Sequence, residues 1–398
     1  MMISVEDAFK RIVETTKPLT TEKIVLEKAS GRVLAAPLTA RRTQPGADMS
    51  AMDGYAVKSS SLTGKPTTLK LIGESAAGSP FPSACGDGEA VRIFTGGIVP
   101  EGADQVVVQE DCTAEADSVT TAIGPEAGRH IRLAGIDFAV KQIVLDQGTY
   151  ISPKSIGLAA SAGYDHLMVH RAPKVAILAT GDELVPPGKK DFEPFETVNS
   201  TAPQISALLS DAGAEVTILG QTGDDLKALK AAVKKAAGAD ILITIGGASV
   251  GDKDFMQQAL ASEGMALDFW KVAMRPGKPL IFGTMGQTKV IGLPGNPVSA
   301  FVCALLFARP LVDQMMGRPA PLPAGVPLPL ATDLAENGPR QHYMRARLVG
   351  EPGSRHLDPA IAQDSSLVSV LAQCDGLIVR EPNAPVAKVG TMVPFLPF

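Results

Sequence analysis

The sequence contains little cysteine and little histidine for a chain of 398 residues. Its four cysteines lie far apart and form no Cys-x-x-Cys pair, which argues against a zinc knuckle and against a disulfide framework. Five histidines are too few to indicate a His-rich metal site. We therefore expect a reducing compartment, and we expect any bound metal to have oxygen ligands.

Positive charge and aromatic rings are also scarce. The chain has 37 Lys and Arg residues against 42 Asp and Glu residues, a net charge of −5, and only one Trp, four Tyr and 13 Phe residues. Nonspecific nucleic-acid binding requires a basic face, and stacking on bases requires aromatic platforms. We therefore expect no nucleic-acid partner.

Long hydrophobic segments are absent from the sequence. The N-terminus carries acidic residues and no long apolar region, so no signal peptide is indicated. The longest uncharged run, 290–308, is interrupted by Pro294 and Pro297, which leaves an apolar stretch of about 11 residues, too short to cross a bilayer. We expect no membrane association and a cytoplasmic location.

The length favours two to four domains, and an apolar content of 45% is enough to form their cores. Helical spacing predicts helices over 4–16 and 153–163, and we expect the second to pack against the first. Short β-type runs occupy 65–150 and return after the Pro-rich segment 317–330. The predicted units are an N-terminal helical and linking unit (1–45 with 139–172), a β-rich unit (46–138), an α/β unit (173–317) and a small β-barrel-like C-terminal unit (318–398).

The segment 173–312 has the clearest pattern. Strands at 175–179, 216–219 and 241–245 alternate with helices near 202–212, near 224–237 and from about Asp254. This βαβαβ order predicts a doubly wound parallel sheet. Two further short strands follow, and then a helix that begins at Pro297 with Asn296 as its cap. The predicted fold class is therefore a multidomain protein with a central α/β domain and two β-rich domains.

Three loops that follow the predicted parallel strands combine glycine, hydroxyl residues and carboxylates: 180–183, 222–225 and 246–254. Ligands of open α/β sheets bind at the carboxyl ends of the strands, so these loops should share one site. The helix N-terminus at 294–297 favours an anion, and Lys271, Arg275 and Lys278 add three cations. Clustered carboxylates need a hard cation, which is Mg²⁺ where phosphate is present.

Each of these features also has a structural interpretation. Asp182, Asp224 and Asp254 stand where helix N-caps are common, Gly246 and Gly247 are typical of a tight turn, and the cations are compatible with a solvated surface. Taken together on one predicted edge, they favour a phosphate-bearing ligand with Mg²⁺. No spacing matches GxxxxGK[ST] or GxGxxG, which disfavours P-loop and Rossmann dinucleotide sites.

Six sequence blocks, in this order, resemble the molybdopterin molybdenumtransferases of the MoeA type, which are related to the C-terminal domain of gephyrin. The blocks are Ser50–Ala56, Thr95–Asp104, Thr180–Leu184, 246–254, Arg275–Pro279 and Gly292–Ser299. On residue pattern alone, the first two would be structural turns. The resemblance covers nearly the whole chain. It implies a four-domain subunit whose α/β domain binds molybdopterin and is similar to MogA.

The resemblance also implies an activity and an assembly. Members of the family insert molybdate into adenylylated molybdopterin, hydrolyse the adenylate with a divalent cation such as Mg²⁺, and release molybdenum cofactor and AMP. They are elongated homodimers, and the loop that contains Asp53 reaches the active site of the other subunit. A molybdopterin adenylyltransferase is a further expected partner.

The resemblance assigns roles by position. The family's functional acids correspond to Asp53, Glu183, Asp224 and Asp254, its hydroxyl residue to Thr95, its cations to Lys271 and Arg275, and its paired prolines to Pro294 and Pro297. These acids and Thr95 are the predicted catalytic residues, and the candidate metal ligands are Glu183, Asp224 and Asp254, among which spacing does not choose. Together with the loops described above, the predicted substrate-binding residues are Gly181, Asp182, Gly246, Gly247, Ser249, Gly251, Lys271, Arg275, Lys278, Pro294, Gly295, Asn296, Pro297 and Ser299. The chain departs from the family at 199–201 and at Ile136, and in the C-terminal unit the matches are reduced to Arg345 and 363–366.

Two other functions are compatible with parts of the sequence. A molybdopterin adenylyltransferase has a related α/β domain, but it resembles only 173–312 and leaves the long N-terminal region unexplained. A receptor-clustering scaffold like gephyrin is the other alternative, but nothing in the chain resembles an appended linker or adenylyltransferase domain.

Overall fold

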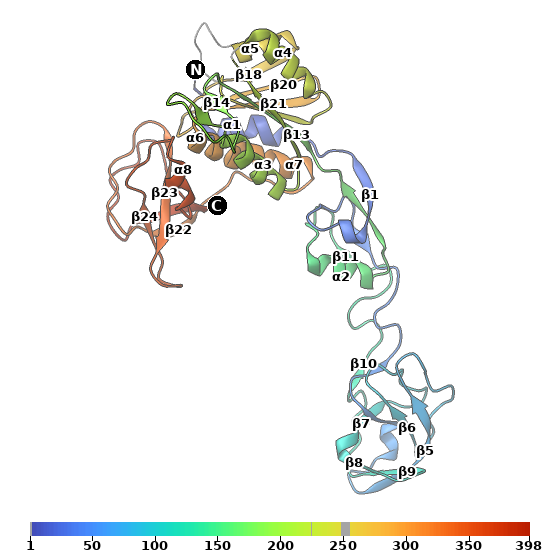
Figure 1. Cartoon of the computed structure of the whole chain (residues 1–398). Helices are drawn as coiled ribbons and strands as arrows, with labels where there is room; N and C mark the ends of the chain where they lie inside the picture. The colour runs from blue at the N-terminus through green and yellow to red at the C-terminus, as the bar shows by residue number, and fades with distance from the viewer. Residues whose placement is uncertain (1, 224, 248–254) are drawn as a thin grey trace.

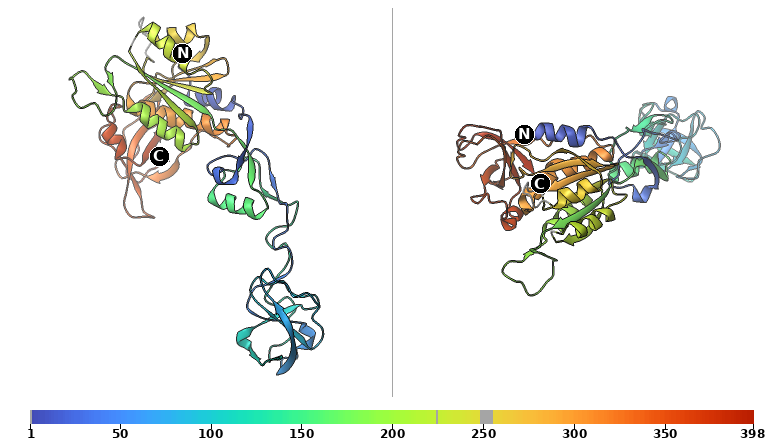
Figure 2. Two further views of the ribbon diagram at one scale, coloured as in Figure 1. Left: turned by 45° about the vertical axis from the view of Figure 1, so that its right-hand side comes forward. Right: turned by 90° about the horizontal axis from the view of Figure 1, so that it is seen from above.

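The computed structural model describes residues 2–223, 225–247 and 255–398. The molecule is elongated (Figure 1), with an N-terminal β unit at one end and the α/β and C-terminal β units at the other. The chain starts at the α/β end, runs out to the N-terminal β unit and returns, so two segments pass side by side through a narrow connection. The left view of Figure 2 shows the same separation from another direction.

The α/β unit is built on a six-stranded sheet with the order β16-β13-β17-β21-β20-β18. Its strands are β13 (Lys174–Thr180), β16 (Glu215–Thr222), β17 (Ile241–Ile245), β18 (Met265–Phe269), β20 (Ile281–Met285) and β21 (Thr288–Leu293). The first four strands in the sheet order are parallel, which confirms the predicted core. β20 and β18 are antiparallel to their neighbours, because only two residues join β20 to β21 and such a short loop forces a hairpin.

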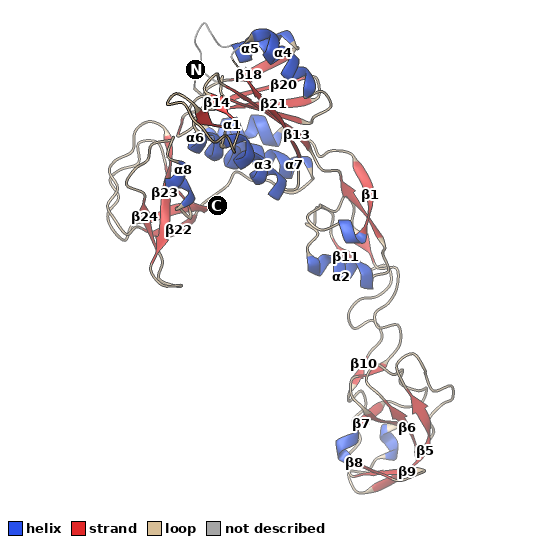
Figure 3. Ribbon diagram, viewed as in Figure 1, coloured by secondary structure: helices blue, strands red, loops and turns tan. Residues whose placement is uncertain are grey.

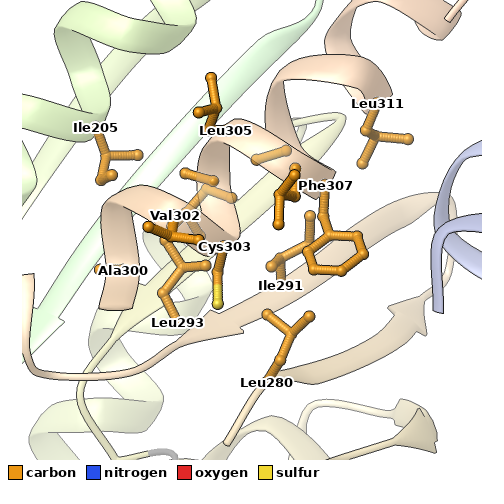
Figure 4. Packing of buried hydrophobic residues seen from close by; sticks show 14 of the residues in the cluster. Ile205, Leu280, Ile291, Leu293, Ala300, Val302, Cys303, Leu305, Phe307 and Leu311 are labelled. Carbon is orange, nitrogen blue, oxygen red and sulfur yellow. The ribbon is translucent and has the colours of Figure 1, made fainter. Parts of the chain in front are cut away.

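Helices cover both faces of this sheet. One face carries α1 (Val5–Phe9) with η1 (Lys10–Glu14), α3 (Thr201–Asp211), α6 (Pro297–Cys303) with η5 (Ala304–Ala308), and α7 (Arg309–Met315). The other face carries α4 (Leu226–Lys235) and α5 (Phe255–Ser262). Figure 4 shows how side chains of α6, η5 and α7 pack against the strand residues Ile291 and Leu293.

The N-terminal helix belongs to the core of the α/β unit. Phe9 and Ile12 are buried in the same cluster as the sheet residues. The second predicted helix, α2 (Pro153–Ser161), instead packs through Ala159 with Leu26 and Leu167 in a separate small core. The predicted packing of α2 on α1 is therefore wrong, because each apolar face finds a different partner.

Among the described residues, one helix is long and apolar enough to cross a membrane, Pro297–Met315 with 19 residues. This helix is longer than the uninterrupted apolar stretch that the sequence shows after Pro297, because the helical backbone continues past Arg309 and through Pro310. Of its most apolar window, 78% is buried inside the protein. This helix has the burial of a core helix.

The N-terminal β unit contains a six-stranded sheet with the order β7-β4-β6-β5-β9-β8, and Figure 3 shows that strands and loops dominate it. Its strands are β4 (Gly54–Val57), β5 (Thr67–Ser75), β6 (Glu89–Ile93), β7 (Gln105–Val108), β8 (Cys112–Ala114) and β9 (Ser118–Thr121), and its short 3-10 helices are η3 (Ser59–Ser61) and η4 (Gln109–Asp111). The connection is formed by short antiparallel pairs: β1 (Thr21–Val25) with β12 (His166–His170), β2 (Leu38–Thr39) with β11 (Ile143–Leu145), and β3 (Met49–Ser50) with β10 (Ile131–Arg132). The 3-10 helix η2 (Leu26–Lys28) follows β1.

The C-terminal unit is built on the third six-stranded sheet, and a strand from the α/β segment joins this sheet. β19 (Met274–Arg275) comes from the α/β segment and pairs in parallel with β23 (Gln341–Val349). The other elements are β22 (Val326–Pro329), β24 (His356–Pro359), α8 (Val368–Ala372), β25 (Gly376–Arg380) and β26 (Met392–Pro397). This pairing places the C-terminal unit next to the carboxyl edge of the α/β sheet.

Candidate functional site

A cavity of about 880 Å³ lies at the carboxyl ends of β13, β17 and β21. Many of the predicted site residues line it together: the catalytic and metal-ligand candidate Glu183, and the substrate-binding candidates Gly181, Gly246, Gly247, Lys271, Lys278, Pro294, Gly295, Asn296 and Pro297. The structure thus brings acidic, basic and glycine-rich segments into one pocket. This is the arrangement expected for a ligand at the end of an open α/β sheet.

Glycines allow the pocket loops to approach one another closely. Gly246 has a φ of +88°, and a Cβ there would lie 2.5 Å from the carbonyl oxygen of Thr180. A Cβ on Gly181 would lie 2.6 Å from the carboxylate of Glu183. At Gly246 the nearest atom belongs to the backbone, so the available space requires glycine, and the tight turn predicted there also forms a wall of the pocket. At Gly181 the Glu183 carboxylate can shift, and glycine is favoured by the φ of +152°.

The acidic part of the pocket is represented by Glu183. Its carboxylate folds back over Gly181, and Asp182 Oδ1 lies 2.6 Å from the position of a Cβ on Gly223. No helix begins after Asp182, so its cap interpretation is wrong, whereas Asp225 caps α4 by accepting a hydrogen bond from the Ala228 amide at 2.7 Å. Four predicted site residues lie outside the described residues: Asp224, Ser249, Gly251 and Asp254.

The predicted metal ligands can be compared with the structure only at Glu183. Within the described ranges no group of three or more His, Cys, Asp or Glu residues is placed to hold a metal ion. Glu183 supplies an oxygen donor on the pocket wall, which is the ligand type that Mg²⁺ takes. The carboxylate in the described part of the pocket wall therefore fits Mg²⁺.

The basic part of the pocket comes from a loop that returns on itself. The Val272 amide donates to the Lys278 carbonyl at 3.0 Å, and the Ile3 amide donates to the Lys271 carbonyl at 3.2 Å. In the described part of the chain, neither Lys271 nor Lys278 forms an ion pair with a carboxylate. Both ammonium groups can therefore neutralise an incoming oxyanion.

The C-terminal unit contributes wall residues to which the sequence prediction assigned no role. Ser366 and Val368 line the pocket. The Asn296 side-chain amide donates to Ser365 Oγ at 3.0 Å, so Asn296 occupies the N-cap position of α6 without capping it through its side chain. Arg345 is only 2% exposed and donates to the carbonyls of Ala362, Asp364 and Leu367. Arg345 thereby holds the loop that carries Ser365 and Ser366.

The segment at which the chain departs from the resembled family also lines the pocket. Asn199, Ser200 and Thr201 lie in the wall, next to Thr197 and Val198. Asn199 is 7% exposed, and its Oδ1 accepts a hydrogen bond from the Ala202 amide at 3.2 Å. Asn199 directly follows β15 (Thr197–Val198), and β15 pairs with β14 (Leu184–Val185). The two short β-type runs before α3 are the sequence signal that could have indicated this place for Asn199.

Among the described residues, three that were predicted to bind substrate do not line the pocket: Asp182, Arg275 and Ser299. Ser299 is buried in the first turn of α6 with 5% exposure. Arg275 lies on β19 opposite His342 of β23. Burial and the nearby Arg275, Arg340 and Arg380 lower the pKa of His342 to about 4.

Asp53 and Thr95 form a unit of their own in the N-terminal β unit. The Asp53 carboxylate accepts hydrogen bonds from the Thr95 amide at 2.7 Å and the Thr95 hydroxyl at 2.8 Å. These bonds lower the pKa of Asp53, with a further contribution from Arg92. Neither residue lines the pocket, and their β unit lies at the far end of the molecule (Figure 1). Within one subunit the two sites are thus separate.

Known proteins similar to this chain extend over its full length. A molybdopterin molybdenumtransferase of Haemophilus influenzae is 34% identical over 404 aligned residues, which cover 100% of this chain and 99% of the relative. A molybdopterin molybdenumtransferase of Staphylococcus aureus is 32% identical over 98% of this chain and 94% of its own length. The chain belongs to the molybdopterin molybdenumtransferase family.

The parts of this family member match in the expected order. The MoeA N-terminal region (domain I and II) matches residues 3–163, a probable molybdopterin binding domain matches 176–314, and the MoeA C-terminal region (domain IV) matches 327–398. A crystal structure of a molybdopterin biosynthesis MoeA protein from Pyrococcus horikosii has a TM-score of 0.86 at 26% identity and covers 100% of this chain and 99% of that chain. The predicted multidomain fold class is therefore confirmed.

We predict that the free energy of unfolding of this molybdenumtransferase family member decreases in mild acid because of His342. Because the pKa of His342 is about 4 in the folded chain, the unfolded chain, with a pKa near 6.5, binds a proton that the folded chain does not. Stability should thus fall by up to about 3 kcal/mol as the pH drops from about 7 to about 4. Urea unfolding of the wild type and of His342→Gln at several pH values should show a shallower dependence in the variant. Parallel curves would contradict the prediction.

Proposed function

We propose that this chain inserts molybdate into adenylylated molybdopterin, hydrolyses the adenylate, and releases molybdenum cofactor and AMP. The observation that supports the proposal most directly is the meeting of Glu183, Lys271 and Lys278 in one pocket. Molybdate and the adenylate phosphates are oxyanions, and ammonium groups without carboxylate partners attract them. Full-length similarity to molybdopterin molybdenumtransferases gives independent support.

The described residues divide the work of the proposed reaction. Lys271 and Lys278 hold oxyanions, and the backbone amides at the start of α6 add dipoles of the same sign. Ser366 and Asn296 are hydrogen-bonding groups placed beside them. Glu183, and Asp224 and Asp254 by family resemblance, would hold Mg²⁺. When bound, Mg²⁺ would stabilise the charge that develops on phosphate oxygens as the phosphoanhydride bond breaks.

We further propose a homodimer in which Asp53 and Thr95 of one subunit complete the pocket of the other. Two features support this assembly. The N-terminal β unit, which contains the hydrogen-bonded Asp53 and Thr95, lies at the end of the molecule opposite the α/β unit (Figure 1). In addition, Leu133, Ile136 and Ile143 are apolar side chains of the connection with 57%, 68% and 54% exposure, and a second subunit lying along the connection would cover them.

The remaining proposals follow from the same reaction. The four-unit division (1–45 with 139–172, 46–138, 173–317 and 318–398) would give each subunit a pocket domain and a separate domain that reaches the partner. An adenylyltransferase must supply the adenylated substrate and is the expected partner enzyme. The cytoplasm is the proposed location.

The proposed activity can be tested with the purified chain. Adenylylated molybdopterin, molybdate and MgCl₂ should yield AMP and a product that activates an apo-molybdoenzyme. Chelation with EDTA should stop AMP release, and added Mg²⁺ should restore it. If the chain instead forms the adenylate from molybdopterin and ATP, it is an adenylyltransferase, and the proposal is wrong.

A further inference from the structure

The pocket contains one aromatic side chain among its described lining residues, and it belongs to Trp270, the sole tryptophan of the chain. The ammonium group of the adjacent Lys271 lies over the indole ring, with Nζ 3.6 Å from the ring centroid. Both residues are partly buried and both line the cavity. The indole therefore provides a surface on which the Lys271 ammonium rests inside the pocket.

The backbone at Lys271 and directly after it is also held. The Lys271 carbonyl accepts from the Ile3 amide at 3.2 Å, and the Ala273 amide donates to the Ile3 carbonyl at 2.8 Å. The N-terminal segment thus forms a bridge with Val272 and fixes the starting point of the Lys271 side chain. Only the four-carbon stem remains to be ordered, and the indole contact orders it.

An ammonium group can contact a ring and still bind an anion, since it has three N–H donors. A free lysine side chain loses rotamer entropy of about 2 kcal/mol when it is fixed in one geometry. A cation–π contact that exists before the ligand arrives removes part of that cost from the binding step. Lys278 also lines the pocket, but none of the cation–π contacts between described residues involves its ammonium.

We propose that Trp270 is a positioning residue that pre-organises Lys271 for an oxyanion of the substrate. This inference rests on the proposed function, in which Lys271 binds molybdate or the adenylate phosphate. Both are oxyanions, so molybdate alone and AMP alone serve as separate probes. The probe whose affinity depends on Trp270 identifies the oxyanion that Lys271 holds.

The test is a double-mutant cycle on the full chain with Trp270→Leu, Lys271→Met and the double variant, and binding is measured by calorimetry. Trp270→Leu should weaken binding of one probe by about threefold to tenfold. In the Lys271→Met background the same change should have little further effect, because the ring acts through the ammonium. Trp270→Phe keeps an aromatic face and should stay within about twofold of the wild type.

Fluorescence supplies a readout that does not require replacing the tryptophan. Because Trp270 is the only tryptophan, its emission reports on the charge above its ring. Lys271→Met should change the emission of the ligand-free chain, whereas Lys278→Met, the matched control, should leave it as in the wild type. Identical spectra for all three proteins would overturn the proposal.

The binding experiment separates the two proposals. If the wild type binds a probe but Trp270→Leu binds both probes with unchanged affinity, the positioning role is wrong and the proposed function stands. The positioning role is also wrong if Trp270→Leu weakens binding equally with and without Lys271. If the wild type binds neither probe and releases no AMP, both proposals are wrong.

Discussion

Co-expression of Asp53→Ala and Glu183→Ala chains should restore about a quarter of the wild-type activity per subunit, although each variant alone is expected to be inactive. In a mixed dimer one pocket receives the intact Glu183 of its own subunit and the intact Asp53 of the other. The second pocket of that dimer carries both defects. With random pairing half of the dimers are mixed, and half of their pockets are complete.

The expected recovery follows from the separation of the two groups within one chain. Asp53 is fixed by Thr95 through two hydrogen bonds, at 2.7 and 2.8 Å, while Glu183 lines the pocket at the opposite end of the molecule. A subunit that used only its own residues could not join them without a large rearrangement. Two affinity tags, one on each variant, allow the mixed dimers to be isolated and assayed for molybdate-dependent AMP release.

Two control experiments make the result specific. Mixing Asp53→Ala with Thr95→Ala should give no recovery, because both changes damage the same unit. Asp117→Ala removes an exposed carboxylate from the same β unit and should leave activity near the wild-type value. Isolated mixed dimers of Asp53→Ala and Glu183→Ala that remain inactive would contradict the shared site.

The sequence predicts local structure well where one pattern dominates. The βαβαβ segment alternates short strands with helices, its strands β13 and β17 are buried, and the observed β17 has the predicted bounds, 241–245. The direction of β20 could not be read from its apolar residues, because a buried strand has the same composition in either direction. Its direction depends on the two-residue connection to β21, which the strand pattern does not include.

Contacts between distant segments explain what the sequence prediction missed in the site. Asn296 follows the cap pattern, yet its side chain donates to Ser365, 69 residues away. Likewise, spacing alone groups Arg275 with Lys271 and Lys278, but the pairing of β19 with β23 directs the Arg275 segment into the C-terminal sheet. Local spacing carries no information on either contact, since both depend on how two domains meet.

Replacement of Gly246 by alanine should destabilise the α/β unit and impair its pocket. Gly246 has a φ of +88°, and its Cβ would lie 2.5 Å from the Thr180 carbonyl oxygen and 3.3 Å from Thr180 Cγ2. Since the closest atom belongs to the backbone of β13, relief requires the loops after β13 and β17 to move apart. We expect a cost of about 3 kcal/mol, the sum of left-handed strain and overpacking.

Gly264→Ala is the matched control for this change. Gly264 has the same φ, +88°, but no atom lies within 4 Å of its Cβ position, so alanine there should cost only the backbone strain, about 1 kcal/mol. Urea unfolding followed by Trp270 fluorescence should therefore give a clearly lower midpoint for Gly246→Ala than for Gly264→Ala. Molybdate-dependent AMP release should fall only in Gly246→Ala, because Gly246 lines the pocket and Gly264 does not. Equal midpoints would mean that the loops after β13 and β17 move apart without a cost in stability. The close approach of Gly246 to Thr180 would then not explain why glycine occupies position 246.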